Sequence, residues 1–260
     1  MNNHNTMKTR LLAALSILLA LAWGGCVKDK SFEGEAYTLR LNFRPSANGE
    51  ALQLGKEYIN PLGEDYTVST FKFYISHISL LQDQPQPVAE DLNGVYLVDA
   101  SNEASKTVTV TLNGTSFNKL AFQVGIDSIL NVSGAQTGAL DPLNGMFWTW
   151  NSGYIMAKLE GTSSLSNSPG QAMTYHIGGF SGNEKTQRQV ILSLPQQQSW
   201  TLERTNVTEV VIDVDIDQWF SAVHPLSIGA RPETMMPGPL AVQYADNYAR
   251  MFRMETILRR

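Results

Sequence analysis

The stretch STFKFYISHISLL, residues 69–81, shows the pattern that decides the fold class. Two sets of apolar side chains recur at alternate positions and mark the two faces of an extended segment: Phe71, Phe73 and Ile75 on one face, and Tyr74, Ile78 and Leu80 on the other. Successive side chains of a β-strand point to opposite faces of a sheet, so a period of two indicates a strand. The sequence therefore predicts a β-strand here.

The same alternation recurs along most of the remaining chain. It is found in residues 37–43, 94–100, 106–112, 119–127, 154–161, 172–178, 188–194 and 208–216. Asn113-Gly114 follows one of these segments and predicts a hairpin turn, because both residues tolerate positive φ. Helical spacing of apolar residues is clearest near the end of the chain, where it predicts a helix over 240–254. We therefore predict an all-β protein, an antiparallel β-sandwich with long loops and a short C-terminal helix; two small β subdomains are the alternative.

The first 25 residues have the layout of a bacterial lipoprotein signal peptide. Lys8 and Arg10 precede an apolar run, residues 11–23, which is too short to span a membrane comfortably. Cys26, the only cysteine in the chain, follows two glycines and is expected to be acylated and to become the first residue of the mature protein. The alternative is an ordinary signal peptide with an incidental cysteine.

This layout predicts three segments and a location. Residues 1–25 are expected to be removed, residues 26–35 to form a polar tether, and residues 36–260 to form the β domain. We expect the protein in the periplasm or at the cell surface, anchored to a membrane, such as the outer membrane, through the lipid on Cys26.

The composition and the motifs argue against two classes of function. A formal net charge of −5 and the lack of a basic tract make a nucleic-acid partner unexpected. The chain has no G-x-S-x-G, H-E-x-x-H or P-loop motif, and its one cysteine is assigned to the anchor. We therefore expect that the protein is not an enzyme.

Three histidines of the expected mature domain are ranked by position. His176 precedes Gly178-Gly179 at a strand end, on the polar face, which is typical of a ligand as well as of a plain polar residue. His224 lies in a loop and is the second candidate; a solvated loop histidine is the alternative. His77 shares a strand face with the first apolar set, so we interpret it as a hydrogen-bonded core histidine.

Met235 and Met236 lie in a Pro/Gly-rich loop rather than on an apolar strand face. Thioether and imidazole groups together suit soft copper(I) in an exported protein. Packing into the core is the alternative, since methionine commonly fills gaps there. If copper is bound, we expect His176 to be a ligand, with His224 and the two methionines completing a soft site.

Asp213, Asp215 and Asp217 alternate along one strand and therefore share a face. Carboxylates in such a row could contribute oxygen ligands to calcium. No glycine turn or further oxygen ligand lies nearby in the sequence, so we interpret the row as a solvated acidic face.

The stretch GMFWTWNSGY, residues 145–154, places Trp148 and Trp150 on either side of Thr149. In an extended segment the two indoles should point to the same side, and we expect at least one to be mostly buried. A buried structural corner and a site that uses an indole chemically are both compatible with this pattern.

Several stretches, taken in order, resemble the MbnP family of exported copper-binding proteins: FKFYISHISLL, FQVGID, GMFWTWNSGYIMAKLEG, YHIGG and NYARMF. The resemblance implies a β-rich protein of the periplasm or cell surface, partnered with a di-haem cytochrome c peroxidase-like protein. Some relatives bind copper through histidines and a tryptophan oxidised to kynurenine, so the resemblance implies that one indole near residues 145–154 is structural and another oxidisable. Trp148, Trp150 and Trp219 are available for that oxidation.

Two positions depart from what the resemblance implies. Many relatives carry a histidine at the end of the first strand, where this chain has Arg44, Pro45 and Ser46, and Met-His where it has Met235-Met236. A copper-binding lipoprotein is the first hypothesis. The alternative is a binding or scaffolding lipoprotein that keeps the same β domain without metal.

Overall fold

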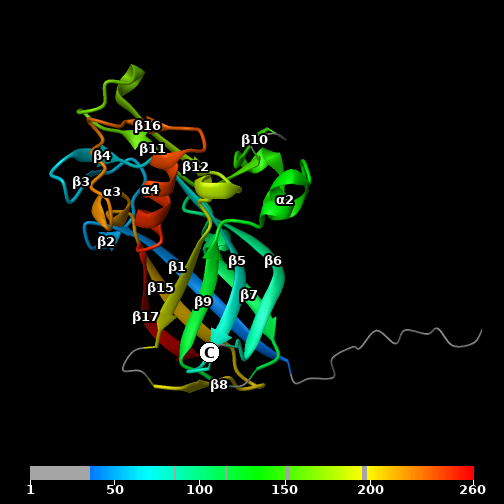
Figure 1. The fold of residues 1–260 in the computed structure, drawn as a ribbon. Helices are drawn as coiled ribbons and strands as arrows, with labels where there is room; N and C mark the ends of the chain where they lie inside the picture. The colour runs from blue at the N-terminus through cyan, green and yellow to red at the C-terminus, as the bar shows by residue number, and fades with distance from the viewer. Residues whose placement is uncertain (1–35, 85, 115, 150–152, 195–197) are drawn as a thin grey trace, which may run out of the picture. The chain divides into compact units, whose positions relative to one another are not determined.

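The computed structural model describes residues 36–84, 86–114, 116–149, 153–194 and 198–260. Cys26, the expected signal peptide and tether, and Trp150 lie outside the described residues. Figure 1 shows that the described part consists mainly of curled β-sheets, with the α-helices gathered beyond one end of the strands. Within these ranges, no helix has the length and apolar character needed to cross a membrane.

The first sheet is built around β1. Its strands are β1 (Tyr37–Ala47), β2 (Glu50–Ala51), β7 (Thr107–Leu112), β15 (Thr208–Asp215) and β17 (Phe252–Arg259). β1 pairs with β15, β7 and β2, and β17 pairs with β15. β1 and β15 run parallel, with Leu39 opposite Thr208, because most of the second sheet is inserted between them as a long crossover. The antiparallel prediction holds for most pairs but not for this one.

The second sheet is built around β5 and β11. Its strands are β5 (Thr70–Leu81), β6 (Ala89–Asp99), β9 (Lys119–Val124), β10 (Phe147–Thr149), β11 (Gly153–Thr162), β12 (Ala172–Gly178), β13 (Arg188–Ser193) and β16 (Glu233–Thr234). β5 pairs with β6, with β11 near its start and with β9 further along. β11 pairs with β12, and β12 pairs with β16 in parallel. The longer strands of this sheet overlap the segments of alternating sequence, whereas β10 and β16 were not predicted; the all-β prediction is confirmed.

Short elements connect and flank the two sheets. The small strand pairs are β3 (Glu57–Ile59) with β4 (Asp65–Thr67), and β8 (Ser116–Phe117) with β14 (Trp200–Thr201). The helices are α2 (Ser128–Val132), α3 (Gln218–Ser221) and α4 (Pro239–Tyr248), with 3-10 turns η1 (Glu103–Lys106), η2 (Gly138–Leu140), η3 (Pro142–Asn144), η4 (Pro169–Gln171) and η5 (Gly182–Glu184).

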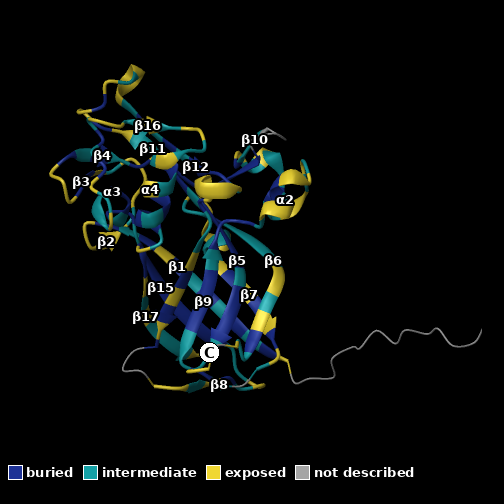
Figure 2. Ribbon diagram, in the orientation of Figure 1, coloured by how far each residue is buried: buried dark blue, intermediate teal, exposed yellow. Residues whose placement is uncertain are grey.

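The main core lies between the two sheets and is centred on aromatic rings from both. The Phe43 ring on β1 meets the rings of Phe73 and Phe122 edge to face, with centroids 5.8 and 5.9 Å apart. Phe252 on β17 closes the group, 5.0 Å from Phe122. Edge-to-face pairs add about 0.5–1.5 kcal/mol to the gain from burial. Figure 2 shows buried residues along the strands of both sheets and exposed ones on α2.

A β-bulge at His77 changes the faces predicted for β5. His77 has φ of 50°, and the pairing of β5 with both neighbours shifts register there. The extra residue returns Ile78 and Leu80 to the main-core face, together with Phe73. The prediction that they lie on the opposite face is therefore wrong.

His77 itself is not a core histidine, contrary to the interpretation from the alternating pattern. Its side chain is 32% exposed, and its Nε2 lies 2.8 Å from Asp127 Oδ1. The bulge accounts for this, because it turns the residue out of the strand's regular alternation.

Asn113-Gly114 does not form the predicted hairpin turn. β7 ends at Leu112 in the first sheet, whereas β9 belongs to the second, so the chain crosses between sheets here. Gly114 is needed instead because its backbone lies close to that of Val88: a Cβ at Gly114 would lie 2.7 Å from the Val88 carbonyl oxygen.

The C-terminal helix is shorter than the sequence pattern predicts. α4 starts at Pro239, where proline suits the first turn, and ends at Tyr248. The residues after Met251 form β17 instead of continuing the helix to residue 254. Pairing with β15 and burial of Phe252 in the main core favour the strand over the helical pattern.

Candidate functional site

A second, smaller apolar cluster lies on the face of the second sheet that points away from the main core, which we call the outer face. Its buried members are Tyr74, Ile126, Leu140, Met146, Tyr154, Ile155 and Met156. Partly buried residues, including Phe147, Trp148 and Phe180, pack against them. The segment from α2 to β10 thus folds over this face and brings the tryptophan stretch onto it.

The two strands at the described ends of the tryptophan stretch pair with each other, and one buried amide holds them. β10 and β11 pair with Phe147 opposite Tyr154 and Thr149 opposite Gly153. Asn131 Oδ1 accepts a hydrogen bond of 2.9 Å from the Tyr154 backbone N–H. Gly153 has φ of 72°, and a Cβ there would lie 2.5 Å from Asn131 Oδ1, so glycine is required at this corner.

Trp148 rests on the end of β12. A Cβ at Gly178 would lie 2.6 Å from Cζ3 of the Trp148 ring, so the indole lies directly on this glycine. Trp148 is partly buried against the smaller apolar cluster on the outer face. The expectation that the two indoles share a side remains a prediction, because Trp150 lies outside the described residues.

His176 lies on the same face of β12 as Trp148. Tyr175 and Ile177 point into the main core, so His176 and Gly178 point to the outer face. The two positions are two residues apart, about 6.6 Å along a strand. The His176 side chain is 15% exposed, and its Nε2 lies 2.6 Å from Glu160 Oε1.

The methionine loop begins beside His176. β16 pairs in parallel with β12, with Tyr175 opposite Thr234, so Met235 follows next to His176. A Cβ at Gly179 would lie 3.5 Å from Pro237 Cβ, which places the far end of the loop at the same strand end. Met235 is 47% exposed and Met236 is 74% exposed, so they are not core residues.

Two lysines and two carboxylates accompany His176 on the outer face. Lys72 and Lys158 lie directly opposite each other on β5 and β11. Asp99 lies 2.9 Å from the Lys72 ammonium, and Glu160 lies 3.8 Å from that of Lys158. Each lysine thus has a carboxylate nearby, which offsets the repulsion between the two ammonium groups.

The ammonium groups also hold the start of the tryptophan stretch. Lys72 Nζ donates to the Asn144 carbonyl at 3.2 Å, and Lys158 Nζ donates to the next carbonyl, that of Gly145. Burial lowers the pKa of Lys158 below its ordinary value. The buried Lys158 ammonium therefore holds the Gly145 carbonyl in place. Breaking this hydrogen bond would leave a buried polar group without a partner, which is unfavourable.

The charge state of Glu160 decides which nitrogen of His176 is available. The hydrogen bond with His176 lowers the pKa of Glu160 to about 2, against the opposing effect of burial. An ionised carboxylate only accepts hydrogen bonds, so Nε2 of a neutral His176 carries the proton. Its Nδ1 keeps the lone pair, and no hydrogen bond to Nδ1 is formed by the residues that the structure describes.

His224 is not brought to this end of β12. Its Nε2 lies 3.0 Å from Asp246 Oδ2 on α4, and its backbone N–H donates to Asn247 Oδ1. α4 packs on the core side of β12, where the Tyr244 ring lies 4.6 Å from Tyr175. His176 points to the opposite side, so β12 separates the two histidines. The structure therefore places His176, the end of β16 that leads to Met235 and Met236, and the Trp148 ring along one end of β12, and it leaves His224 apart.

The acidic row on β15 is not a solvated face, contrary to our interpretation. Asp213 and Asp217 are buried. Asp213 lies 2.9 Å from the Arg253 guanidinium, and Asp217 accepts a hydrogen bond of 2.6 Å from the Tyr66 hydroxyl. Across the described residues, no group of three or more His, Cys, Asp or Glu side chains is arranged to hold a metal ion.

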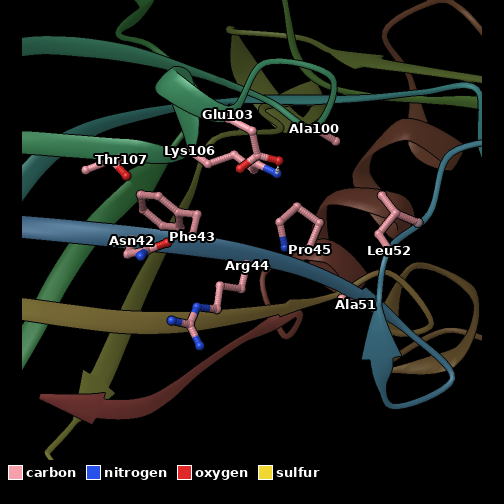
Figure 3. Close-up of a pocket in the computed structure, with 10 residues that line it drawn as sticks. All are labelled: Asn42, Phe43, Arg44, Pro45, Ala51, Leu52, Ala100, Glu103, Lys106 and Thr107. Atoms are coloured by element: carbon pink, nitrogen blue, oxygen red, sulfur yellow. Dashed lines mark hydrogen bonds and ion pairs between the residues drawn. The ribbon is translucent and has the colours of Figure 1, made fainter.

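The end of the first strand opens onto a cavity of about 400 Å³. Its lining residues are Asn42, Phe43, Arg44, Pro45, Ala51, Leu52, Ala100, Glu103, Lys106 and Thr107 (Figure 3). None of these ten carries an imidazole or a thioether, so the cavity has no soft metal ligand. Figure 3 shows Arg44 pointing away from Glu103 and Lys106, and its guanidinium lies 3.7 Å from Glu255 on β17.

Glu160, Lys158 and Asn131 were not among the site residues expected from the sequence. A signal for the first two exists in YIMAKLEG, where charged residues alternate with the core residues Ala157 and Leu159 of a buried strand. Charged groups are rarely buried without partners, so such a pattern indicates paired charges. Asn131 gives no comparable signal, because its role depends on a loop conformation.

Comparison with known proteins agrees with this architecture. MbnP from Methylosinus trichosporium is similar in structure, with a TM-score of 0.51 and 16% sequence identity over 74% of this chain and 80% of that one. At this identity the likeness shows the fold alone. The comparison with curated proteins gives no match. The family model for MbnP matches residues 36–236, which is most of the chain. On the strength of that match, this protein is a member of the MbnP family.

Proposed function

We propose that this protein is an exported, lipid-anchored copper-binding protein of the MbnP type, without enzymatic activity of its own. The observation that carries the copper assignment is the convergence at the end of β12. His176 lies there with Nδ1 available, Met235 follows beside it, and the Trp148 indole rests on Gly178. Family membership and the expected lipoprotein signal support the rest of the proposal.

The donors at this strand end fit copper(I) better than a hard cation. Imidazole and thioether are soft or borderline ligands that copper(I) accepts, whereas calcium and magnesium prefer oxygen. The exposed Met236 leaves the site open to an incoming ion. A histidine whose second nitrogen binds a carboxylate is also the usual arrangement of a metal ligand. A bound copper ion would supply one-electron chemistry, and the protein would supply the soft donors and the fixed imidazole.

Copper content of the purified mature domain tests this proposal. We expect the wild-type domain to retain copper and His176→Ala to lose it. His77→Ala is a matched control, because His77 also binds a carboxylate through Nε2 but lies at the bulge of β5. His224→Ala should retain copper as well. A wild-type domain that retains no copper, or a His176→Ala variant that retains all of it, would contradict the proposal.

The family resemblance supports two further parts of the proposal. We propose a di-haem cytochrome c peroxidase-like protein as the partner, and oxidation of a tryptophan, with Trp148 the one that lies at the copper site. Peptide mass spectrometry of protein isolated from its native host would show whether Trp148 or Trp150 is modified. Both unmodified in copper-loaded protein would contradict the tryptophan assignment.

A metal-free binding lipoprotein is the second candidate. Exposed apolar side chains on the segment beside Trp148 favour it: Ile129 and Val132 on α2, and Leu143 on η3, which is 93% exposed. Single exposed apolar residues are common, but three on one small segment are consistent with a protein-binding surface. Absence of copper from wild-type protein, together with loss of a bound partner on replacing Leu143 by serine, would favour this candidate.

A further inference from the structure

His176 is held by a carboxylate that lies closer to the imidazole than to the neighbouring lysine. Glu160 Oε1 lies 2.6 Å from His176 Nε2 but 3.8 Å from the Lys158 ammonium. Glu160 lies opposite Thr70 on β5 and Thr174 on β12, and Thr70 also donates a hydrogen bond to it. Neighbours on both sides thus keep the carboxylate under the imidazole.

The same strand connects Glu160 to the tryptophan stretch. Lys158, two residues before Glu160 on β11, lies opposite His176 and donates its ammonium hydrogen to the Gly145 carbonyl. Gly145 begins the stretch that ends in the β10–β11 hairpin and carries Trp148. One short segment of β11 therefore fixes both the imidazole and the start of the indole-bearing loop.

We propose that Glu160 is a positioning residue for the copper site: it binds Nε2 of His176 and reserves Nδ1 for the metal. This inference rests on the proposed function, since it takes copper as the ligand of His176. Glu160 has no direct contact with the metal in this scheme. Glu160 holds the imidazole of His176 in one orientation and one tautomer before copper binds. The free energy of ordering the ring is then not lost on binding, so the affinity for copper is higher.

The chain contains an internal control for this arrangement. His77 and Asp127 form the same contact, with Nε2 2.8 Å from Oδ1, and both side chains are more exposed than those of His176 and Glu160. No methionine loop or indole adjoins them in the contacts of the described residues. Removal of Asp127 should therefore free one histidine without changing copper binding.

Copper(I) affinity, measured by competition with a chelator, gives the first test. We expect Glu160→Ala to weaken binding by about 10–100-fold, the usual effect of removing the partner of a ligating histidine. Glu160→Gln should restore part of the loss, because its amide oxygen still accepts from Nε2. Asp127→Ala should match the wild type, and His176→Ala should abolish the site. Wild-type affinity in Glu160→Ala, with binding lost in His176→Ala, would overturn the role of Glu160 while the proposed function stands.

Nuclear magnetic resonance of the metal-free domain gives a readout that does not depend on copper. A hydrogen-bonded imidazole N–H exchanges slowly with water, so the wild type should show a His176 Nε2–H signal at neutral pH. The signal should disappear in Glu160→Ala, remain in Asp127→Ala, and return in Glu160→Gln. If it persists in folded Glu160→Ala, Glu160 does not position the ring, whatever the copper content. If the signals behave as expected but the wild type binds no copper, the proposed function fails and only the orientation by Glu160 remains.

Discussion

Gly178 is the residue on which the Trp148 indole rests, and it shows how one missing side chain shapes the site. Its position on β12 needs no positive φ, so the glycine is required by space alone. A Cβ there would meet the ring at 2.6 Å and the Tyr154 carbonyl oxygen at 2.8 Å. The carbonyl belongs to the backbone, so it cannot simply rotate away.

Gly178→Ala should therefore displace the indole and lower the free energy of unfolding by about 1–3 kcal/mol, the usual cost of overpacking. Thermal unfolding and tryptophan fluorescence would measure the two effects. Gly229→Ala is the control, because the nearest atoms to a Cβ at Gly229 are 3.6 Å away. Equal stability of the two variants would show that Trp148 does not lie on Gly178.

Glu64 is a second residue whose surroundings determine its behaviour. Its buried carboxylate accepts hydrogen bonds from the Ser227 hydroxyl at 2.6 Å and from the Ile228 and Gly229 backbone N–H groups. Burial alone raises its pKa, but these bonds and that of Asn60 outweigh burial and lower it below the ordinary value. Glu64 thus ties the loop that leads to β16 to the β3–β4 pair.

The depressed pKa of Glu64 sets the sign of its pH effect. Its contribution to stability is present above the unfolded-state pKa, about 4.3, and is lost as the pH falls through the lower folded-state pKa. We expect Glu64→Gln to lower the free energy of unfolding at neutral pH by about 1–3 kcal/mol and to flatten its dependence on pH below about 5. Denaturant unfolding of both proteins at several pH values would measure this. If the free energies of unfolding of the wild type and Glu64→Gln changed with pH in parallel, the role of Glu64 would be contradicted.

At the scale of elements, alternation in the sequence predicted the strands but not their local irregularities. Phe73 and Ile75 were placed correctly because nothing interrupts the pleat between them. Ile78 was placed on the wrong face because the bulge at His77 inserts one residue, and only a spacing of three between Ile75 and Ile78 hints at it. The end of α4 was missed for a different reason: pairing with β15 overrides a helical pattern that continues past Tyr248.

The candidate site could be predicted only in part. The place of His176 at the end of β12, on the face away from the core, was predicted correctly because alternation and a following glycine pair make it readable; its role as a ligand stays a prediction. Its separation from His224 depends on which side of β12 α4 covers, and that is a property of the assembled sheets. The contact between Glu160 and His176 could not be predicted, because it depends on the pairing register of β11 and β12, and a single sequence does not contain that register.

The β11 strand makes a testable prediction of its own. Lys158→Met keeps the length of the side chain but removes the donor to the Gly145 carbonyl, so the loop at residues 145–149 should open more often. Hydrogen exchange of these amides should become faster, with little change in the main core. Lys106→Met is the control, because Lys106 pairs with the exposed Glu103 on η1, away from this loop. Unchanged hydrogen exchange at residues 145–149 would show that Lys158 does not hold this loop in place.

At the scale of the whole molecule, the anchor and the copper site are expected to serve one purpose. A lipid on Cys26 would hold the protein at a membrane, while the β domain presents the end of β12. Cys26→Ser should release the protein into the soluble fraction of the cell envelope without changing its copper content. Cell fractionation with immunodetection measures the first effect, and a variant that stays wholly in the membrane fraction would rule out the lipid anchor.

The most direct test of the copper site is X-ray absorption spectroscopy at the copper edge of the loaded protein. The end of β12 predicts imidazole nitrogen and thioether sulfur as neighbours of the metal, with the sulfur signal lost when Met235 and Met236 are both replaced by leucine. A wild-type spectrum with nitrogen and oxygen neighbours alone, or one unchanged by the double substitution, would contradict a site built from His176 and the methionine loop.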